Sequence, residues 1–353
     1  MLDTRHTRVL TVDPVVPASE QIALAAAALQ RGELVAFPTE TVYGLGANAF
    51  DADAVAGIFA AKQRPTSDPL IVHLATLDQL GDVVAELPPL ALELARQFWP
   101  GPLTLVLPRG PRIPPGVSAG MNTVAVRIPN HPVAYALLKA AGLPVAAPSA
   151  NRFARPSPTT AQHVLDDLQG RIEIVLDGGP TPIGLESTVL SLVGAQPALL
   201  RPGGVPIEAL QALLPTLVYR PRYAEIADGA QPAPGMLLKH YAPNAELLLF
   251  RGPHNAVMAS MRDTALAHSS QCVGIMIADE DTALFTDLDV AVVQLGSRAN
   301  LAQVGARLFA GLRELEHQGV DVILVRSFEQ GGLGLAIWDR LLRATEGRIV
   351  EVT

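Results

Sequence analysis

Basic side chains in this sequence stand at the ends of apolar, strand-like runs. Lys62 and Arg64 end a predicted helix in "AAKQRPTSDPLIVHL", and Arg127 lies near the end of the apolar run "TVAVRIPN". Arg201 follows a further short apolar run in "LLRPGGV". Guanidinium and ammonium groups placed at such ends suit the carboxylates and phosphates of a ligand. Each is also compatible with an ordinary helix end or sheet edge, but the set favours one pocket for a polyanion.

Small polar residues follow other predicted strands. The segment "LPVAAPSANRFARPSPTT" runs a strand into Ser149 and Asn151 and then reaches Ser157, and "GLESTVLSL" opens a strand with Ser187 and Thr188. Ser, Asn and Pro are common in loops, and they also line the crevices that form where strands of an α/β sheet end. We therefore expect these segments to join the basic residues in one site.

Two common nucleotide cradles do not fit the sequence. Gly44, Gly46 and Ala49 form a Gly-x-Gly-x-x-Ala pattern, but the polar and aromatic segment 38–43 separates them from the preceding strand and the next helix signal begins only at Asp51. None of the three lysines follows a glycine, so the Gly-Lys-Ser/Thr core of a P-loop is absent. Any ATP chemistry must use another cradle.

Composition limits the remaining classes of protein. The chain has 353 residues, 49% of them hydrophobic, and a formal net charge of −8, which argues against a large non-specific nucleic-acid surface. Its one cysteine, Cys272 in "CVGIMIA", excludes an internal disulfide framework and is predicted to be a buried core thiol. Cys-x-x-Cys and His-Glu-x-x-His are both absent, so no protein-built metal site is predicted. No apolar targeting segment opens the sequence, and a cytoplasmic protein is expected.

The elements that must position these residues fall into two predicted domains. Helices are predicted over 19–31, 51–63, 89–98, 131–141, 159–169 and 206–214, and strands over 34–38, 70–75, 103–108, 123–129, 145–148, 172–177, 187–193 and 197–201. Residues 216–244 carry four prolines without a sustained period and are predicted to be a linker. Beyond it, four apolar strands alternate with helices at 254–267, 301–316 and 334–345, which indicates a small parallel α/β domain.

Eight segments in order resemble one protein family. "FPTETVYGLG", "KQRP", "WPGPLTLVL", "VAVRIPNHP", "APSAN", "PSPTT", "ESTV" and "LRPGG" are similar to the YrdC/Sua5 family of threonylcarbamoyl-AMP synthases, and "PGMLLKHYAP" and "GLGLAIWDRLLRAT" resemble its longer Sua5 type. The resemblance implies a twisted, open, mixed α/β sheet with helices over 1–215. It implies a linker over 216–244 that crosses the active-site cleft, and a smaller Rossmann-like domain over 245–353. In this fold the opening glycines are expected to bend the chain after Thr41.

The resemblance also implies a set of site residues. L-threonine is expected to contact Thr41, His73, Arg127, Ala147 and Ser187. ATP is expected to contact Lys62, Arg64, Asp68, Thr123, Ser149, Asn151, Ser157, Arg201 and Tyr241, with Lys62, Arg64, Ser149 and Asn151 as the catalytic set. Asp68 departs from the asparagine that is common in the family, and the sequence leaves open whether it faces metal or nucleotide. Mg²⁺ is expected to accompany ATP.

The implied reaction joins L-threonine, bicarbonate and ATP into threonylcarbamoyl-AMP and pyrophosphate, for the t6A modification of tRNA. It needs no covalent enzyme nucleophile, which agrees with the lack of a Ser-His-Asp or Cys-His pattern. The expected partners are the downstream threonylcarbamoyl-transfer machinery and, weakly, tRNA itself. A tRNA or double-stranded RNA binding protein without catalysis is the alternative from another class. A related carbamoyl-adenylate-forming enzyme of the hydrogenase-maturation type is disfavoured, because that type carries several cysteines. The sequence leaves the general base, the oligomeric state and the role of the second domain open.

Overall fold

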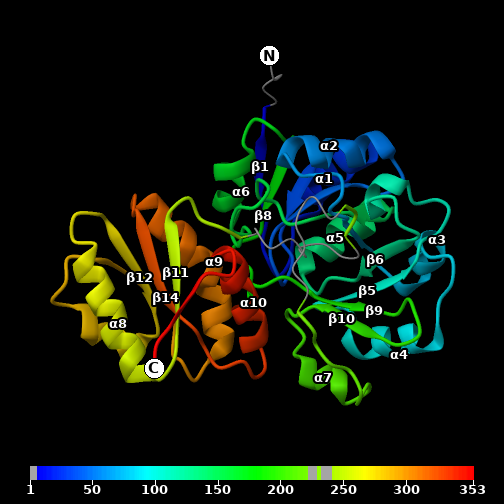
Figure 1. Cartoon of the computed structure of the whole chain (residues 1–353). Helices are drawn as coiled ribbons and strands as arrows, with labels where there is room; N and C mark the ends of the chain where they lie inside the picture. The colour runs from blue at the N-terminus through cyan, green and yellow to red at the C-terminus, as the bar shows by residue number, and fades with distance from the viewer. Residues whose placement is uncertain (1–5, 222–228, 232–240) are drawn as a thin grey trace. The chain divides into compact units, whose positions relative to one another are not determined.

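The computed structural model describes residues 6–221, 229–231 and 241–353 (Figure 1). Contacts between Cα atoms divide the chain into two compact units. The first comprises Met1–Phe153, Ser157–Pro182 and Glu186–Met236, and the second comprises Ala154–Pro156, Ile183–Leu185 and Leu237–Thr353. Most of the predicted linker lies outside the described residues, so its path across a cleft stays a prediction.

The first unit is built on a mixed ten-stranded sheet with the order β1-β8-β2-β3-β7-β4-β6-β5-β9-β10. Its strands are β1 (Arg8–Thr11), β2 (Val35–Phe37), β3 (Gly44–Asn48), β4 (Ile71–His73), β5 (Leu103–Pro108), β6 (Thr123–Arg127), β7 (Val145–Ala146), β8 (Ile174–Asp177), β9 (Thr188–Ser191) and β10 (Ala198–Arg201). Its helices are α1 (Ser19–Gln30), α2 (Ala52–Lys62), α3 (Leu80–Val83), α4 (Pro89–Phe98), α5 (Pro132–Ala141), α6 (Ala161–Leu168) and α7 (Ile207–Gln211). Both parallel and antiparallel neighbours occur, which confirms the mixed sheet.

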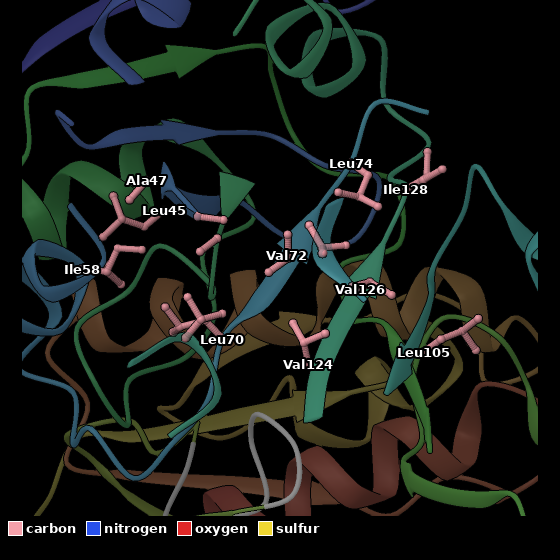
Figure 2. Packing of buried hydrophobic residues seen from close by; sticks show 14 of the residues in the cluster. Leu45, Ala47, Ile58, Leu70, Val72, Leu74, Leu105, Val124, Val126 and Ile128 are labelled. Atoms are coloured by element: carbon pink, nitrogen blue, oxygen red, sulfur yellow. The ribbon is translucent and has the colours of Figure 1, made fainter. Parts of the chain in front are cut away.

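Alternating side chains of the short strands feed two cores on opposite faces of this sheet. In β2, Val35 and Phe37 join the core under α1 and α5, whereas Ala36 joins the larger core on the other face. That larger core gathers side chains from α2, α4 and α6 and from most strands, and Figure 2 shows part of it around Val72, Val126 and other labelled residues. The sheet therefore has one face covered along its length by apolar packing.

The expected bend at the glycines was wrong. Gly44 and Gly46 lie inside β3, which pairs antiparallel with β2, and the chain turns earlier, within 38–43. A Cβ atom added to Gly46 would lie 2.8 Å from Val145 Cγ1 and 2.9 Å from Phe37. Glycine is therefore required at position 46 for close packing between strands, and not for a bend.

Local signals explain where the two helices nearest the candidate site begin and end. The Asp51 carboxylate accepts hydrogen bonds from the backbone N–H groups of Asp53 and Ala54 and caps α2, and Gln63 ends this helix in the left-handed conformation with φ 56°. Pro132 opens α5 and Gly142 ends it with φ 68°. These stops fix the points at which the chain leaves α2 toward Arg64 and leaves α5 toward β7.

The second unit is a parallel α/β fold, as the sequence predicts. Its strands β11 (Glu246–Arg251), β12 (Val273–Ile277), β13 (Ala291–Gln294), β14 (Val322–Arg326) and β15 (Ile349–Glu351) pair in parallel in the order β13-β12-β14-β11-β15. Figure 1 shows α8 (His254–Ala267) on one face of this sheet and α9 (Leu301–His317) and α10 (Gly334–Ala344) on the other. Within the described residues, no helix is both long and apolar enough to cross a membrane.

The prediction for Cys272 was wrong. Its side chain is exposed, because the residue stands just before β12, where the backbone N–H donates to the Asp321 carboxylate at 2.9 Å. The apolar run "VGIMI" that follows is buried as expected. Hydropathy identified the strand, but its first buried position is one residue further on.

Candidate functional site

Strand alternation places several predicted site residues on one face of the first unit's sheet. Val126 of β6 points into the larger core, which leaves Ala125 and Arg127 on the opposite face. Val72 of β4 also points into the larger core, so His73 lies on the same face as Arg127. His73 and Arg127 are directly opposite each other in the register of β4 and β6. Over β4, β5, β6 and β9 this face carries a small cluster of strand residues. Because successive side chains of a strand point to opposite faces of the sheet, these site residues lie on the face opposite the larger core.

Two segments of the chain hold Arg127 through three contacts. Its Nε donates to Gly101 O at 3.1 Å, and its Nη1 donates to Thr41 Oγ1 at 3.0 Å. Its Nη2 lies 2.6 Å from Glu40 Oε2. Only 3% of the Arg127 surface is exposed. A buried guanidinium fixed in this way is preorganised to receive a carboxylate.

His73 lies beside this guanidinium as a neutral imidazole. Burial, together with the positive charge of Arg127, lowers the pKa of His73 to about 3. Its Nδ1 lies 3.2 Å from Ile71 O and donates to it, because a carbonyl oxygen only accepts. The ring also packs edge-on against Phe37, with centroids 6.2 Å apart. His73 is therefore a fixed polar contact and not a proton acceptor at neutral pH.

Ser187 and Arg201 form a second group, at the start of β9 and the end of β10. Ser187 Oγ lies 2.8 Å from Thr104 Oγ1, whose strand β5 is the neighbour of both β6 and β9. Arg201 Nη2 donates to Ser187 O at 2.9 Å and to Ser187 Oγ at 3.2 Å. Adjacent strand ends thus bring a predicted threonine contact and a predicted phosphate contact together.

Lys62 joins the end of α2 to the loop that follows β7. Its ammonium donates to Ser149 O at 2.5 Å and to Asn151 O, and the side chain is almost fully buried. Gly44 pairs with Ser149 across an isolated bridge, and Ala150 N donates to Tyr43 O. The predicted catalytic residues Lys62, Ser149 and Asn151 are therefore neighbours in space, although about 87 positions separate the first two in sequence.

Arg64 and Asp68 form a buried ion pair, with Nη2 and Oδ2 2.9 Å apart. Arg64 also donates from Nε to Asp68 O and from Nη2 to Pro69 O. The carboxylate that departs from the family's usual asparagine thus faces its own arginine. Gln231, in the described part of the predicted linker, donates its backbone N–H to Ser67 O in the same loop at 3.0 Å.

Four further predicted residues take separate positions. Ser157 Oγ donates to Glu186 Oε1 at 2.5 Å, and Ala147 donates its backbone N–H to Ile71 O. Thr123 opens β6 and is partly exposed. Tyr241 belongs to the second unit, where its buried ring lies 5.2 Å from that of Phe309 and 5.3 Å from the Arg340 guanidinium. Its contact with nucleotide stays a prediction.

Sequence reasoning missed two carboxylates of this site. Glu40 lies between two threonines in "FPTETVYGLG", and Glu186 precedes Ser187 in "ESTV". Both are buried, at 5% and 6% exposure. In each case a glutamate lies within a motif whose other residues are typical of buried positions. A buried charge of this kind could have indicated a site residue.

Two family profiles cover most of the chain. Residues 27–203 match the Sua5/YciO/YrdC profile described as "Telomere recombination", and residues 205–345 match "Threonylcarbamoyl-AMP synthase, C-terminal domain". The threonylcarbamoyl-AMP synthase of Pyrococcus abyssi is 44% identical over 333 residues, which are 94% of this chain and 96% of that protein. That of Bacillus subtilis is 44% identical over 352 residues, 99% of this chain and 100% of the relative.

Comparison with solved structures gives the same family and fold as these sequence matches. The crystal structure of P. abyssi Sua5 complexed with L-threonine superposes with a TM-score of 0.91 at 41% identity, covering 98% of this chain and all of that one. Escherichia coli YciO matches with a TM-score of 0.51 at 23% identity over 56% of this chain and 96% of its own, which supports the fold of the first unit.

Proposed function

The chain belongs to the threonylcarbamoyl-AMP synthase family of the two-domain Sua5 type, and we propose that it forms threonylcarbamoyl-AMP and pyrophosphate from L-threonine, bicarbonate and ATP. The observation that carries this proposal is the group of Thr41, His73 and Arg127 on one face of the sheet, in a chain that matches a threonine-bound relative over 98% of its length. The enzyme is accordingly a nucleotidyltransferase.

Arg127 receives the carboxylate of L-threonine in this proposal. The contacts of Arg127 to Gly101 and Thr41 fix the plane of the guanidinium, so a carboxylate meets donors that are already oriented. His73 contributes a neutral polar contact from β4, the neighbour of β6, and Ser187 contributes one from the position before β9. Ala147 offers backbone groups. Such an arrangement favours a small amino acid over a larger polyanion at this end of the site.

Lys62, Arg64 and Arg201 provide the positive charge for ATP. The carbamate oxygen attacks the α-phosphorus while pyrophosphate leaves, so negative charge must be stabilised on the phosphates. Ser149 and Asn151 lie beside Lys62, and Ser157 and Thr123 are proposed to supply further hydrogen-bonding groups. Asp68 holds Arg64 in place rather than binding the polyanion itself.

Mg²⁺ enters this proposal with ATP. Among the described residues, no group of three or more His, Cys, Asp and Glu side chains is arranged to hold a metal ion, and the Asp68 carboxylate is paired with Arg64. The residues therefore do not fit a protein-built metal cage. Mg²⁺ is commonly bound through substrate phosphates, so we assign no step to a resident metal.

The second unit and the linker complete the proposal. Tyr241 and the preceding linker segment are proposed to close over the nucleotide and limit access of water to the labile acyl adenylate. The product is proposed to pass to the machinery that transfers the threonylcarbamoyl group to tRNA in the cytoplasm, and direct tRNA contact is a weaker part of the proposal.

Pyrophosphate release by the purified full chain tests the function. With ATP, release is expected to require both L-threonine and bicarbonate, and the nucleotide product is expected to carry AMP. ADP and phosphate as the products, or release independent of threonine, would overturn the proposal. Salt-sensitive RNA binding without any turnover would support the non-catalytic alternative instead.

A further inference from the structure

Glu40 is a buried carboxylate beside the predicted threonine contacts, and the proposed function gives it no role. Only 5% of its surface is exposed. Its Oε2 lies 2.6 Å from Arg127 Nη2, but the two groups lack hydrogen-bond geometry. Neither carboxylate oxygen has a hydrogen-bond partner among the residues that the structure describes. Burying a charged oxygen in this state costs free energy, so the site retains an acceptor with capacity to spare.

The loop that carries Glu40 is held rigidly. Thr39 Oγ1 accepts from the backbone N–H groups of Thr41 and Val42 and donates to Val42 O at 2.7 Å. The Thr41 hydroxyl in turn lies 2.8 Å from Thr39 Oγ1 and accepts from Arg127. These contacts fix the backbone on both sides of Glu40. Its carboxylate is therefore directed at the Arg127 guanidinium by the fold of the loop.

The pair of Glu40 and Arg127 complements an α-amino acid. A free amino acid carries a carboxylate and an ammonium on the same carbon atom, and this site offers a guanidinium and a carboxylate in direct contact. The ammonium of an α-amino acid is attached to the carbon next to its carboxylate. When that carboxylate binds Arg127, the ammonium therefore lies close to the Glu40 carboxylate, which contacts the same guanidinium. An acceptor with a free oxygen at that position suits both recognition of the ammonium and removal of its proton.

We propose that Glu40 is the catalytic base that deprotonates the ammonium of L-threonine. This inference rests on the proposed function. The Glu40 carboxylate takes one proton from the ammonium and becomes a carboxylic acid. The resulting amine attacks the carbon of bicarbonate, a C–N bond forms, and a C–O bond breaks to release water, which leaves a carbamate. The carbamate oxygen then attacks the α-phosphorus, and Glu40 returns its proton to solvent after the product leaves.

Other titratable groups near this site are already committed. His73 stays neutral, because burial and Arg127 hold its pKa at about 3. Burial also lowers the pKa of His131, opposed by the Glu40 charge, and His131 Nδ1 accepts the backbone N–H of Val133 at 3.2 Å. The Glu186 carboxylate accepts from Ser157 Oγ. Among the groups named here, Glu40 is the carboxylate that contacts the Arg127 guanidinium and keeps oxygens without a hydrogen bond among the described residues.

The variant Glu40→Gln tests the proposal in the full chain. It keeps the size of the side chain and removes the base, so the threonine-dependent rate of pyrophosphate release is expected to fall by about 100-fold near pH 7. The loss is expected to shrink as the pH rises toward 9, because more of the threonine in solution arrives without its ammonium proton. The KM for ATP is expected to stay within about threefold of the wild-type value. A purely structural role would give a loss that does not depend on pH.

Matched variants separate the outcomes. Glu93→Gln changes an exposed glutamate of α4 and is expected to leave the rate unchanged. Glu40→Asp retains a carboxylate and is expected to recover part of the rate, and it serves as the test if the glutamine variant does not fold. An unchanged rate in Glu40→Gln, or a loss equal at pH 7 and 9, overturns the proposal. If the wild-type chain itself shows no threonine-dependent release, the proposed function fails and not this inference alone.

Discussion

Two buried carboxylates, Glu40 in the first unit and Asp281 in the second, are surrounded very differently. Asp281, with 1% of its side chain exposed, lies within 3.5 Å of His254 Nε2, Arg298 Nη2 and Arg326 Nη1. Glu40 has Arg127 as its ion-pair partner and retains oxygens without hydrogen bonds among the described residues. A carboxylate saturated by cations stabilises its surroundings, whereas one with spare acceptor capacity is available to a ligand.

The surroundings of Asp281 come from the ends of three strands. His254 follows β11, Arg298 follows β13, and Arg326 ends β14. His254 Nδ1 also accepts a hydrogen bond from Arg326 at 2.5 Å, so the imidazole, this guanidinium and the Asp281 carboxylate all contact one another. Convergence of charged groups at strand ends thus occurs in both units. Such convergence indicates a ligand site only where the charged groups do not already use their ion pairs and hydrogen bonds on one another.

The largest expected effect is on stability, from Asp281→Asn. Asparagine keeps the size of the side chain but leaves the Arg326 and Arg298 charges without their buried counter-ion. We expect a loss of about 3 kcal/mol in the free energy of unfolding, at the low end for a broken buried pair because Arg298 is partly exposed. Urea denaturation measures this loss. A large change in the KM for threonine with unchanged stability would contradict the contrast with Glu40.

The next effect is on substrate binding, from Arg127→Lys. An ammonium cannot contact Gly101 O, Thr41 and Glu40 together or present a planar fork to a carboxylate. The KM for threonine is expected to rise by about 10- to 100-fold, as for loss of a charge-assisted hydrogen bond, while the KM for ATP changes much less. Steady-state kinetics with each substrate varied in turn measures both constants.

Arg109 provides a control for that variant. It is a partly buried arginine of the same unit that donates to Met121 O and Ile113 O. Arg109→Lys is expected to change stability slightly and neither KM. Equal increases in both constants for Arg127→Lys would remove the assignment of Arg127 to the threonine carboxylate.

The smallest expected effect is the dependence of stability on pH that comes from His73. Its pKa is about 3 in the folded protein and about 6.5 when unfolded, so below pH 6.5 the unfolded chain binds a proton that the folded chain does not. Stability from this group is therefore complete above pH 6.5 and declines as the pH falls, by up to about 2 kcal/mol between pH 6.5 and 5.

Denaturation curves at pH 7 and pH 5 measure this dependence. His73→Asn is expected to flatten it, whereas His6→Asn, at an exposed position near the chain's start, is expected to leave it unchanged. An equal pH dependence in His73→Asn and the wild-type chain would show that His73 is not the group responsible. His131 contributes in the same direction and remains present in both proteins.

Much of the fold could be predicted because its signals are local. The period of apolar residues and the capping residues located α8 at its observed bounds and α2 and α5 to within one residue at each end. Strand β1 was missed because Arg8–Thr11 is short, and β3 was missed because its two glycines suggested a turn. In β3 the packing against β2 and β7 outweighs the weak strand preference of glycine.

The sequence by itself determined the family and the two α/β regions and predicted most residues of the candidate site, because these depend on the order and type of nearby residues. Tertiary structure decided which groups are satisfied. It showed that Lys62 reaches the carbonyl groups of the loop after β7, that Asp68 faces Arg64, and that Glu40 stands against Arg127. These partners are distant in sequence or lie on opposite sides of a turn. Only the folded chain fixes the distances, and the distances decide whether a buried charge is neutralised or left available to a substrate.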